Sequence, residues 1–292
     1  MTKTSKTTPA SGTNQIPLIF FGNEKLVTGG HVEPVIFPAL ARAGYKVEQV
    51  ITGDLGELKP HQAQIAVLAS YGKIIPKRVL DEFPLGIINI HPSLLPSYRG
   101  PTPIESAILD GVNKTGVSIM RLTPGMDEGP IYKQRTVHLS GRETKSELAH
   151  TLQSLGAELL LESLQTIIDG TLSPRQQPHP DRATYSKKIA KEDGVLDFAK
   201  PAVQLEREVR AYMDWPKSTM QIAGKDVVVL EASVDVTAKG DPGTVFRTSG
   251  KKVGVYCSEG ALIVTKLKPA GKQAMSSEGF LAGYGQSIPL KD

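Results

Sequence analysis

The stretch LGIINIHPSLLPSYRG, from Leu85 to Gly100, is the strongest indication of the fold in this chain. It begins as an apolar run typical of a buried strand, and the run ends in Asn89 and His91, two positions apart. Because residues i and i+2 of a strand point to the same face, an amide and an imidazole are directed at one place. Pro92 then ends the strand. Polar groups at the carboxyl ends of strands are where α/β proteins bind ligands.

The sequence around this stretch alternates between strand and helix patterns. Strands are predicted at residues 16–21, 47–51, 65–69, 87–90 and 116–122, and helices at 32–43, 103–109 and 144–168. This alternation predicts βαβ units, a mostly parallel Rossmann-like sheet and right-handed crossovers. We therefore expect the turn after 116–122, which contains Asp127, to lie beside His91 at one edge of the sheet.

The pattern changes in the last third of the chain. After residue 173 come Pro, Ser and basic residues, then a predicted helix at 203–211 and short strands at 226–236, 243–246, 252–257 and 261–267. Short strands separated by turn residues predict a small barrel. We expect a disordered tail (1–15), an α/β catalytic domain (16–173), a linker (174–200) and a C-terminal OB-like β-barrel domain (201–292).

Charge and composition bound the class of protein. The net charge is +4: residues 1–174 hold 16 basic and 16 acidic residues, and residues 175–292 hold 18 and 14. The surplus is either a solvated surface or a modest attraction to phosphates. No apolar run approaches about 20 residues, so we expect no membrane span. The single Cys257 cannot form an internal disulfide, which suits the cytoplasm, and we expect a buried thiol.

Several common sites have no matching motif. The glycines after the first strand follow neither the dinucleotide-binding nor the P-loop spacing. There is no H-x-x-x-H or C-x-x-C pair, so we expect no metal, and there is no G-x-S-x-G turn. These absences disfavour nucleotide, metal and serine-hydrolase chemistry.

Asn89, His91 and Asp127 each have an ordinary structural interpretation. Asn89 suits a strand end, His91 a loop, and Asp127 the Gly- and Pro-rich turn at 123–130, where its side chain would bind its own backbone. Together, however, an amide, an imidazole and a carboxylate suit acyl transfer to an amine. Asn can donate to an oxyanion, and His can move a proton near neutral pH.

These motifs strongly resemble the 10-formyltetrahydrofolate-dependent formyltransferases. The resemblance rests on residues 89–96, on Arg99 and Gly100, and on the GMDEG run at 125–129. It implies that Asn89, His91 and Asp127 are the catalytic trio. It also implies folate contacts for six residues, four in the SLLP loop and two beside the pterin pocket: Ser93, Leu94, Leu95, Pro96, Tyr71 and Gly72.

The C-terminal half resembles the family members that formylate methionyl-tRNA. The similar segments are residues 183–189, 193–198, 209–216, 271–275 and 280–283. The resemblance implies transfer of a formyl group from 10-formyltetrahydrofolate, as cosubstrate, to the α-amino group of initiator methionyl-tRNA. We expect a cytoplasmic monomer without a metal. The linker lysines Lys187, Lys188 and Lys191 are candidate tRNA contacts.

One segment departs from that group. Its members usually carry a long basic loop and a further βα unit after the second strand, whereas here only residues 52–62 lead to the next strand. This departure leaves the mode of tRNA recognition open. An alternative is a formyltransferase for a small amine, such as a nucleotide-linked amino sugar. A second alternative, a non-catalytic RNA-binding protein, is disfavoured by the intact trio.

Overall fold

The computed structural model describes residues 16–23 and 35–290. Contacts divide the chain into two compact units. The first holds residues up to Arg99, Gly116–Val137 and His150–Tyr185, and the second holds Gly100–Thr115, His138–Ala149 and the residues from Ser186 onward. Residues 174–185 thus group with the first unit, while the predicted domain boundaries stay a prediction. The predicted tail (1–15) and the start of the helix predicted at 32–43 lie outside the described residues.

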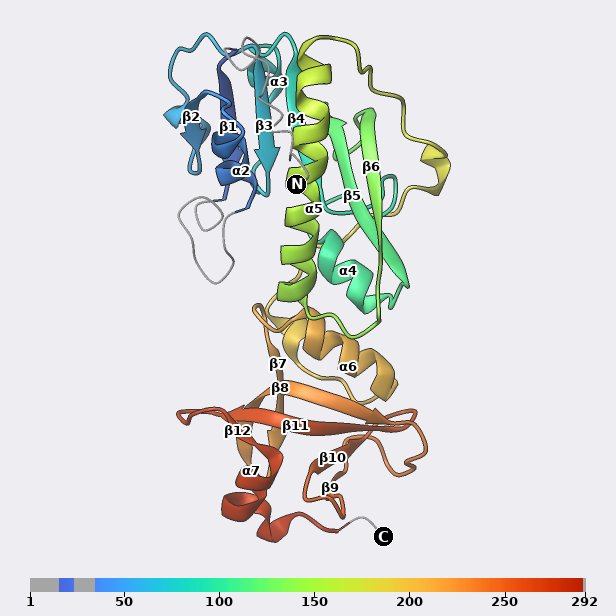
Figure 1. Cartoon of the computed structure of the whole chain (residues 1–292). Coiled ribbons are helices and arrows are strands. Elements are labelled where there is room, and N and C mark those ends of the chain that lie inside the picture. The colour runs from blue at the N-terminus through green and yellow to red at the C-terminus, as the bar shows by residue number, and fades with distance from the viewer. Residues whose placement is uncertain (1–15, 24–34, 291–292) are drawn as a thin grey trace, which may run out of the picture. The chain divides into compact units, whose positions relative to one another are not determined.

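A six-stranded sheet forms the first unit, in the order β2-β1-β3-β4-β5-β6 (Figure 1). Its strands are β1 (Leu18–Gly22), β2 (Val47–Ile51), β3 (Ile65–Ala69), β4 (Gly86–His91), β5 (Lys114–Arg121) and β6 (Ile131–His138). β1 pairs in parallel with β2 and β3, and β3 pairs in parallel with β4. The predicted mostly parallel α/β sheet is confirmed.

The central strands owe their place to continuous apolar sequence. Every residue of β1, β3 and β4 is buried. Parallel strands covered on both faces carry unbroken apolar runs rather than an alternating pattern. In β4 this burial includes Asn89 and His91, so two polar side chains lie in an otherwise apolar layer.

The right-handed crossover expected between the strands predicted at 87–90 and 116–122 is wrong. β5 runs antiparallel to β4, and Asn89 pairs with Met120 while His91 pairs with Ser118. The end of β5 therefore lies at the start of β4, away from His91. The segment from Leu122 to Pro130 has to fold back to bring Asp127 to the other end.

Helices connect the strands of this sheet. Those of the N-terminal half are α2 (Ile36–Arg42), α3 (Lys77–Leu80), α4 (Pro103–Leu109) and α5 (Lys145–Ile168). The long α5 packs closely on the sheet, because a Cβ added to Gly156 would lie 2.7 Å from the Ile90 side chain. Between β2 and β3 the chain forms only the short 3₁₀ helix η1 (Leu55–Glu57).

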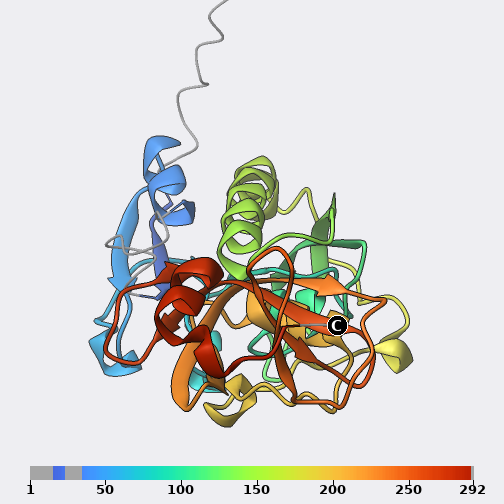
Figure 2. The same cartoon turned by 90° about the horizontal axis from the view of Figure 1, so that it is seen from below.

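The second unit is built on a curled antiparallel sheet. Its strands are β7 (Ser218–Ile222), β8 (Lys225–Asp235), β9 (Val245–Arg247), β10 (Val253–Tyr256), β11 (Ala261–Pro269) and β12 (Met275–Ser276). The order is β7-β8-β11-β10-β9, and β12 pairs with β11. The predicted barrel is thus a half-barrel. Helix α6 (Ala202–Ala211) packs on β8 and β11, and α7 (Ser277–Tyr284), red in Figure 2, packs on β10, β11 and β12.

Cys257 lies in the apolar core of the second unit, where burial raises the pKa of its thiol. The expectation of a buried thiol is confirmed. Within residues 16–23 and 35–290, no helix has both the length and the apolar character needed to cross a bilayer.

Replacing Gly116 with Ala should weaken the packing of β5 on its neighbours. A Cβ at this position would overlap the carbonyl oxygen of Arg135, which is backbone and cannot swing aside. We expect the free energy of unfolding, measured by denaturant titration, to fall by about 1–3 kcal/mol. Gly56→Ala is the matched control, because a Cβ there meets no atom within 4 Å. Equal stability of the two variants would contradict this packing.

Candidate functional site

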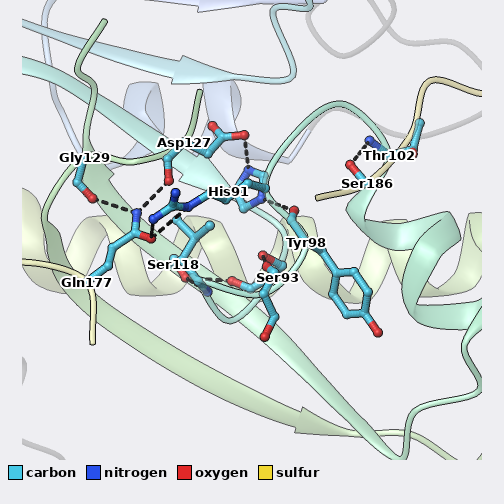
Figure 3. Close-up of polar contacts among 12 residues, drawn as sticks. His91, Ser93, Tyr98, Thr102, Ser118, Asp127, Gly129, Gln177 and Ser186 are labelled. Atoms are coloured by element: carbon cyan, nitrogen blue, oxygen red, sulfur yellow. Dashed lines mark hydrogen bonds and ion pairs between the residues drawn. The ribbon is translucent and has the colours of Figure 1, made fainter. Parts of the chain in front are cut away.

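Asn89, His91 and Asp127 lie at the carboxyl end of β4 and in the segment that folds back toward it. Asn89 and His91 are buried, and Asp127 is partly exposed. The Nδ1 atom of His91 lies 3.8 Å from Oδ2 of Asp127 (Figure 3). This separation suits an ion pair when the ring is protonated and is too long for a direct hydrogen bond. The structure thus brings together the imidazole and the carboxylate predicted from sequence.

The imidazole of His91 is oriented by a backbone group. Its Nε2 atom lies 2.9 Å from the carbonyl oxygen of Tyr98. A carbonyl oxygen can only accept, so Nε2 carries a proton and donates it. In the neutral ring Nδ1 is therefore the unprotonated nitrogen, and it is the one that faces Asp127. Tyr98 itself has a positive φ of 57°, and its N–H donates to Thr184 Oγ1 at 2.8 Å.

The turn that carries Asp127 is tightly constrained. Asp127 has a φ of 51°, in the left-handed region that Asp tolerates better than most residues. Gly129 packs against the backbone of β5, where an added Cβ would overlap the carbonyl oxygen of Arg121. The base of the turn is closed by the Arg121 N–H, which donates to Pro130 O at 2.9 Å.

A buried glutamine holds this turn from the side. Nε2 of Gln177 donates to the carbonyl oxygens of Asp127 at 2.6 Å and Gly129 at 2.9 Å. Its Oε1 accepts from Nη2 of Arg99 at 2.8 Å. Arg99 is buried as well, and it donates to the Tyr185 hydroxyl at 3.0 Å.

The SLLP loop is fixed by side chains of β5 and β6. The hydroxyl of Ser118 donates to the Ser93 carbonyl at 2.6 Å and accepts from the Leu95 N–H at 3.1 Å. Gln134 Nε2 donates to the Leu95 carbonyl at 2.9 Å. Ser93 is fully buried, and its hydroxyl donates to the Ser97 carbonyl at 2.6 Å. The side chains of Leu94 and Pro96 are partly exposed, whereas Leu95 is buried.

Comparison with known proteins identifies the family. The model of the formyl transferase family matches residues 30–164, and the model of the formyl transferase C-terminal domain matches residues 188–285. A methionyl-tRNA formyltransferase of Roseiflexus castenholzii is 38% identical over 252 residues, which cover 86% of this chain and 77% of that protein. The chain belongs to the methionyl-tRNA formyltransferase family. The predicted family and enzyme class are confirmed.

Solved structures support the same fold for this formyltransferase. HypX from Aquifex aeolicus, in complex with tetrahydrofolic acid, matches with a TM-score of 0.67 at 18% identity, over 96% of this chain and 49% of that one. An N-formyltransferase from Helicobacter canadensis, with folinic acid and dTDP-3-aminofucose, matches with a TM-score of 0.62 at 16% identity, over 86% of this chain and 98% of that one. At such identities the likeness concerns the fold.

Tyr71 and Gly72 of the formyltransferase lie in a different environment from the trio. The Tyr71 ring belongs to the core of the first unit, and its hydroxyl donates to the Gly53 carbonyl at 2.9 Å. Burial raises the pKa of this hydroxyl. Gly72 is exposed, with a φ of 74°. The predicted pterin contact at these positions stays a prediction.

The three candidate tRNA contacts lie in the second unit. Lys187, Lys188 and Lys191 are exposed, and their ammonium groups form no ion pair with another described residue. They are therefore accessible to an anionic partner. A cavity of about 600 Å³ in the same unit lies between α6 and β8 and contains none of the predicted site residues. Its Arg210 is already paired with Glu206 at 2.7 Å.

Sequence reasoning missed the residues that position the site. Arg99 was part of the quoted motif without a role, and Gln177 was placed in a linker because prolines flank it. Ser118 offered a weak signal, as a polar residue inside an apolar strand. The described part of the chain has no group of three or more His, Cys, Asp or Glu residues arranged to hold an ion.

The tautomer of His91 can be measured directly. When the His91 ring of this formyltransferase is neutral, its proton should be on Nε2, because the Tyr98 carbonyl accepts a hydrogen bond from that atom. Long-range ¹H–¹⁵N correlation spectra of protein labelled at histidine distinguish the two ring nitrogens. We expect an unprotonated Nδ1 at high pH. A neutral ring with the proton on Nδ1 would contradict the assignment.

Proposed function

We propose that this enzyme transfers a formyl group from 10-formyltetrahydrofolate to the α-amino group of initiator methionyl-tRNA. The observation that carries the proposal is the convergence of His91 and Asp127 at the end of β4, two residues after Asn89, in a member of this family. Amide, imidazole and carboxylate are the groups that acyl transfer to an amine requires.

The loop at Ser93–Pro96 is the proposed wall of the folate site. Leu94 and Pro96 offer partly exposed apolar surface directly after His91 in sequence. Because Ser118 and Gln134 already hold the loop, this surface is formed before a ligand arrives. An apolar wall of fixed shape suits a flat heterocycle. Ser93 would act through the loop's shape, since its hydroxyl is committed to the Ser97 carbonyl.

Asn89 is the proposed oxyanion donor. Its side-chain amide forms no hydrogen bond with another described residue, although Asn89 is only 6% exposed. Its amide atoms are not among the fully buried atoms that lack a partner, so the amide keeps some exposure, and a group supplied by substrate would complete its bonding. When the amine attacks the formyl carbon, the carbonyl oxygen gains charge, and an amide N–H stabilises it more strongly than it stabilises the uncharged carbonyl.

His91 is the proposed proton carrier, and Nδ1 is the nitrogen that acts. Since Nε2 is held by the Tyr98 carbonyl, Nδ1 is the nitrogen that can take a proton from the attacking amine and return it to the leaving nitrogen of the folate. Asp127 lies 3.8 Å from this atom and would stabilise the ring by its charge when it is protonated. Orientation of the ring comes from Tyr98.

The proposed partner is initiator tRNA, held in part by exposed lysines of the second unit. Lys187, Lys188 and Lys191 are free to contact phosphates, and the charge surplus lies after residue 174. The link between β2 and β3 contains only η1, so it offers no long basic loop. We propose that the linker and the C-terminal unit supply this binding instead, in a cytoplasmic monomer.

Formyl transfer to a small amine is the second candidate. It is favoured by the short link between β2 and β3 and by the shared fold with the Helicobacter canadensis enzyme bound to dTDP-3-aminofucose. The identity to methionyl-tRNA formyltransferases over 86% of the chain favours the first candidate.

Removing any member of the trio should abolish most formylation of charged initiator tRNA. We expect His91→Ala, Asn89→Asp and Asp127→Asn each to lower kcat/KM by about 100-fold or more, because each removes a positioned acid, base or donor. Acid–urea gels that separate formylated from unformylated methionyl-tRNA provide the measurement. Charged elongator tRNA should be a poor substrate.

His150→Ala is the control for these variants, because His150 is exposed on α5. It should keep full activity. Variants of the trio should keep their circular dichroism and their folate affinity in calorimetry. Near-normal formylation by His91→Ala would refute the assigned chemistry, and formylation of amino sugars in place of tRNA by the unaltered enzyme would favour the second candidate.

Replacing Lys187, Lys188 and Lys191 together with Ala should weaken tRNA binding and its dependence on salt. The slope of log K against log salt should become shallower by roughly 0.7–0.9 for each lysine that contacts a phosphate. Fluorescence anisotropy with labelled tRNA at several salt concentrations gives this slope. A control removes three exposed charges from the first unit: Lys46, Lys59 and Arg78. An unchanged slope for the linker variant, or equal loss in both, would count against the proposed contact.

A further inference from the structure

The segment from Arg175 to Tyr185 crosses both loops that carry the proposed site. Arg175 pairs with Ile131, directly after the Asp127 turn. At the other end, the Thr184 N–H donates to the Pro96 carbonyl at 3.2 Å and its carbonyl accepts from the Arg99 N–H at 2.9 Å. Gln177 lies between these anchors. A segment whose sequence suggested a linker is therefore part of the first unit and in contact with the site.

Gln177 uses its whole amide in this arrangement. The NH₂ group has two N–H donors, and the carbonyl oxygens of Asp127 and Gly129 accept at 2.6 and 2.9 Å. Oε1 accepts from Nε and Nη2 of Arg99 at 3.2 and 2.8 Å. The two carbonyls flank Glu128, so one side chain spans the part of the turn that sets where the Asp127 carboxylate points.

This clamp, the Gln177 side chain bonded to the turn, is itself held in place. Gln177 is 6% exposed and Arg99 is 5% exposed, so both side chains are shielded from water. Arg99 also donates to the Tyr185 hydroxyl, and its guanidinium lies 5.7 Å from the centre of that ring. Because Arg99 has only donors, it fixes which end of the Gln177 amide faces the turn.

We infer that Gln177 is a positioning residue for formyl transfer, which holds the turn at residues 125–129 so that Asp127 faces His91 Nδ1. The inference rests on the proposed function of this site. Asp127 has a left-handed backbone conformation, and its carboxylate lies 3.8 Å from the ring, so a small rotation of the turn changes the interaction between them. Gln177 acts through Asp127 and need not touch either substrate.

Gln177→Glu is the sharpest test. It keeps the shape and the acceptor for Arg99 but replaces both N–H donors with an oxygen that the two carbonyls repel. We expect kcat to fall about tenfold or more, with both KM values changed less than about twofold, since binding groups stay in place. Hydrogen exchange at residues 125–129 should become faster, even without substrates.

The effect of Gln177→Glu in the absence of the Asp127 carboxylate distinguishes a positioning role from a general loss of structure. In the Asp127→Asn background, Gln177→Glu should lower kcat by less than about twofold, because the group it positions has already lost its charge. Losses that multiply instead would overturn the inference. If Gln177→Glu fails to fold by circular dichroism, Gln177→Met carries the same comparison without adding a charge beside Arg99.

Gln49→Glu is the matched control. Gln49 also bridges backbone groups, with Nε2 donating to the Lys59 carbonyl at 3.0 Å and Oε1 accepting from the Lys59 N–H at 2.9 Å, but it lies on β2. It should leave kcat unchanged. Unchanged kcat and unchanged exchange in Gln177→Glu, with an active parent enzyme, would refute the clamp. A parent enzyme that formylates neither substrate, together with a turn loosened by Gln177→Glu, would refute the proposed function and leave the clamp standing.

Discussion

The antiparallel return of β5 beside β4 is the constraint on which the site depends. Because β5 ends beside the start of β4, a short turn after it would place Asp127 far from His91. The chain instead folds back along the strands, which needs the close backbone approach at Gly129 and a left-handed Asp127. Such a segment has few ladder hydrogen bonds of its own. Gln177, 50 residues further along the chain, supplies missing partners, and Arg99 holds Gln177 in place.

The buried polar side chains of the first unit differ in whether they have hydrogen-bond partners. Ser93, Arg99, Ser118 and Gln177 are all buried, and each donates or accepts hydrogen bonds that fix a loop of the site. Buried polar groups of this kind are stable only when they are paired. The amide of Asn89 contrasts with these four, because it forms no hydrogen bond with another described residue, and we propose that a ligand supplies its partner. Fixed loops around an amide that can still donate suit the preorganised stabilisation of charge.

Much of this could be predicted from sequence, and the remainder could not for physical reasons. Strands β2 and β3 lie where they were predicted, and in β3 a continuous buried apolar run carries that signal. An apolar pattern carries no information about strand direction, so β5 was predicted as a strand but its antiparallel direction was not. Strand β6 was also missed, because Lys, Gln, Arg and His interrupt its apolar residues on both faces. The trio came from two short motifs, whereas Gln177 contacts a turn about 50 residues away and leaves no local pattern.

We propose that Asn89 and Nδ1 of His91 act together on the formyl group. A crystal structure of the enzyme with 5-formyltetrahydrofolate, a stable relative of the donor, tests it most directly. We predict that the folate ring lies against Leu94 and Pro96, and that the formyl group lies about 3 Å from the Asn89 amide on the Nδ1 side of His91. A folate bound away from β4, or a His91 ring that turns Nε2 toward the ligand and leaves the Tyr98 carbonyl, would contradict it.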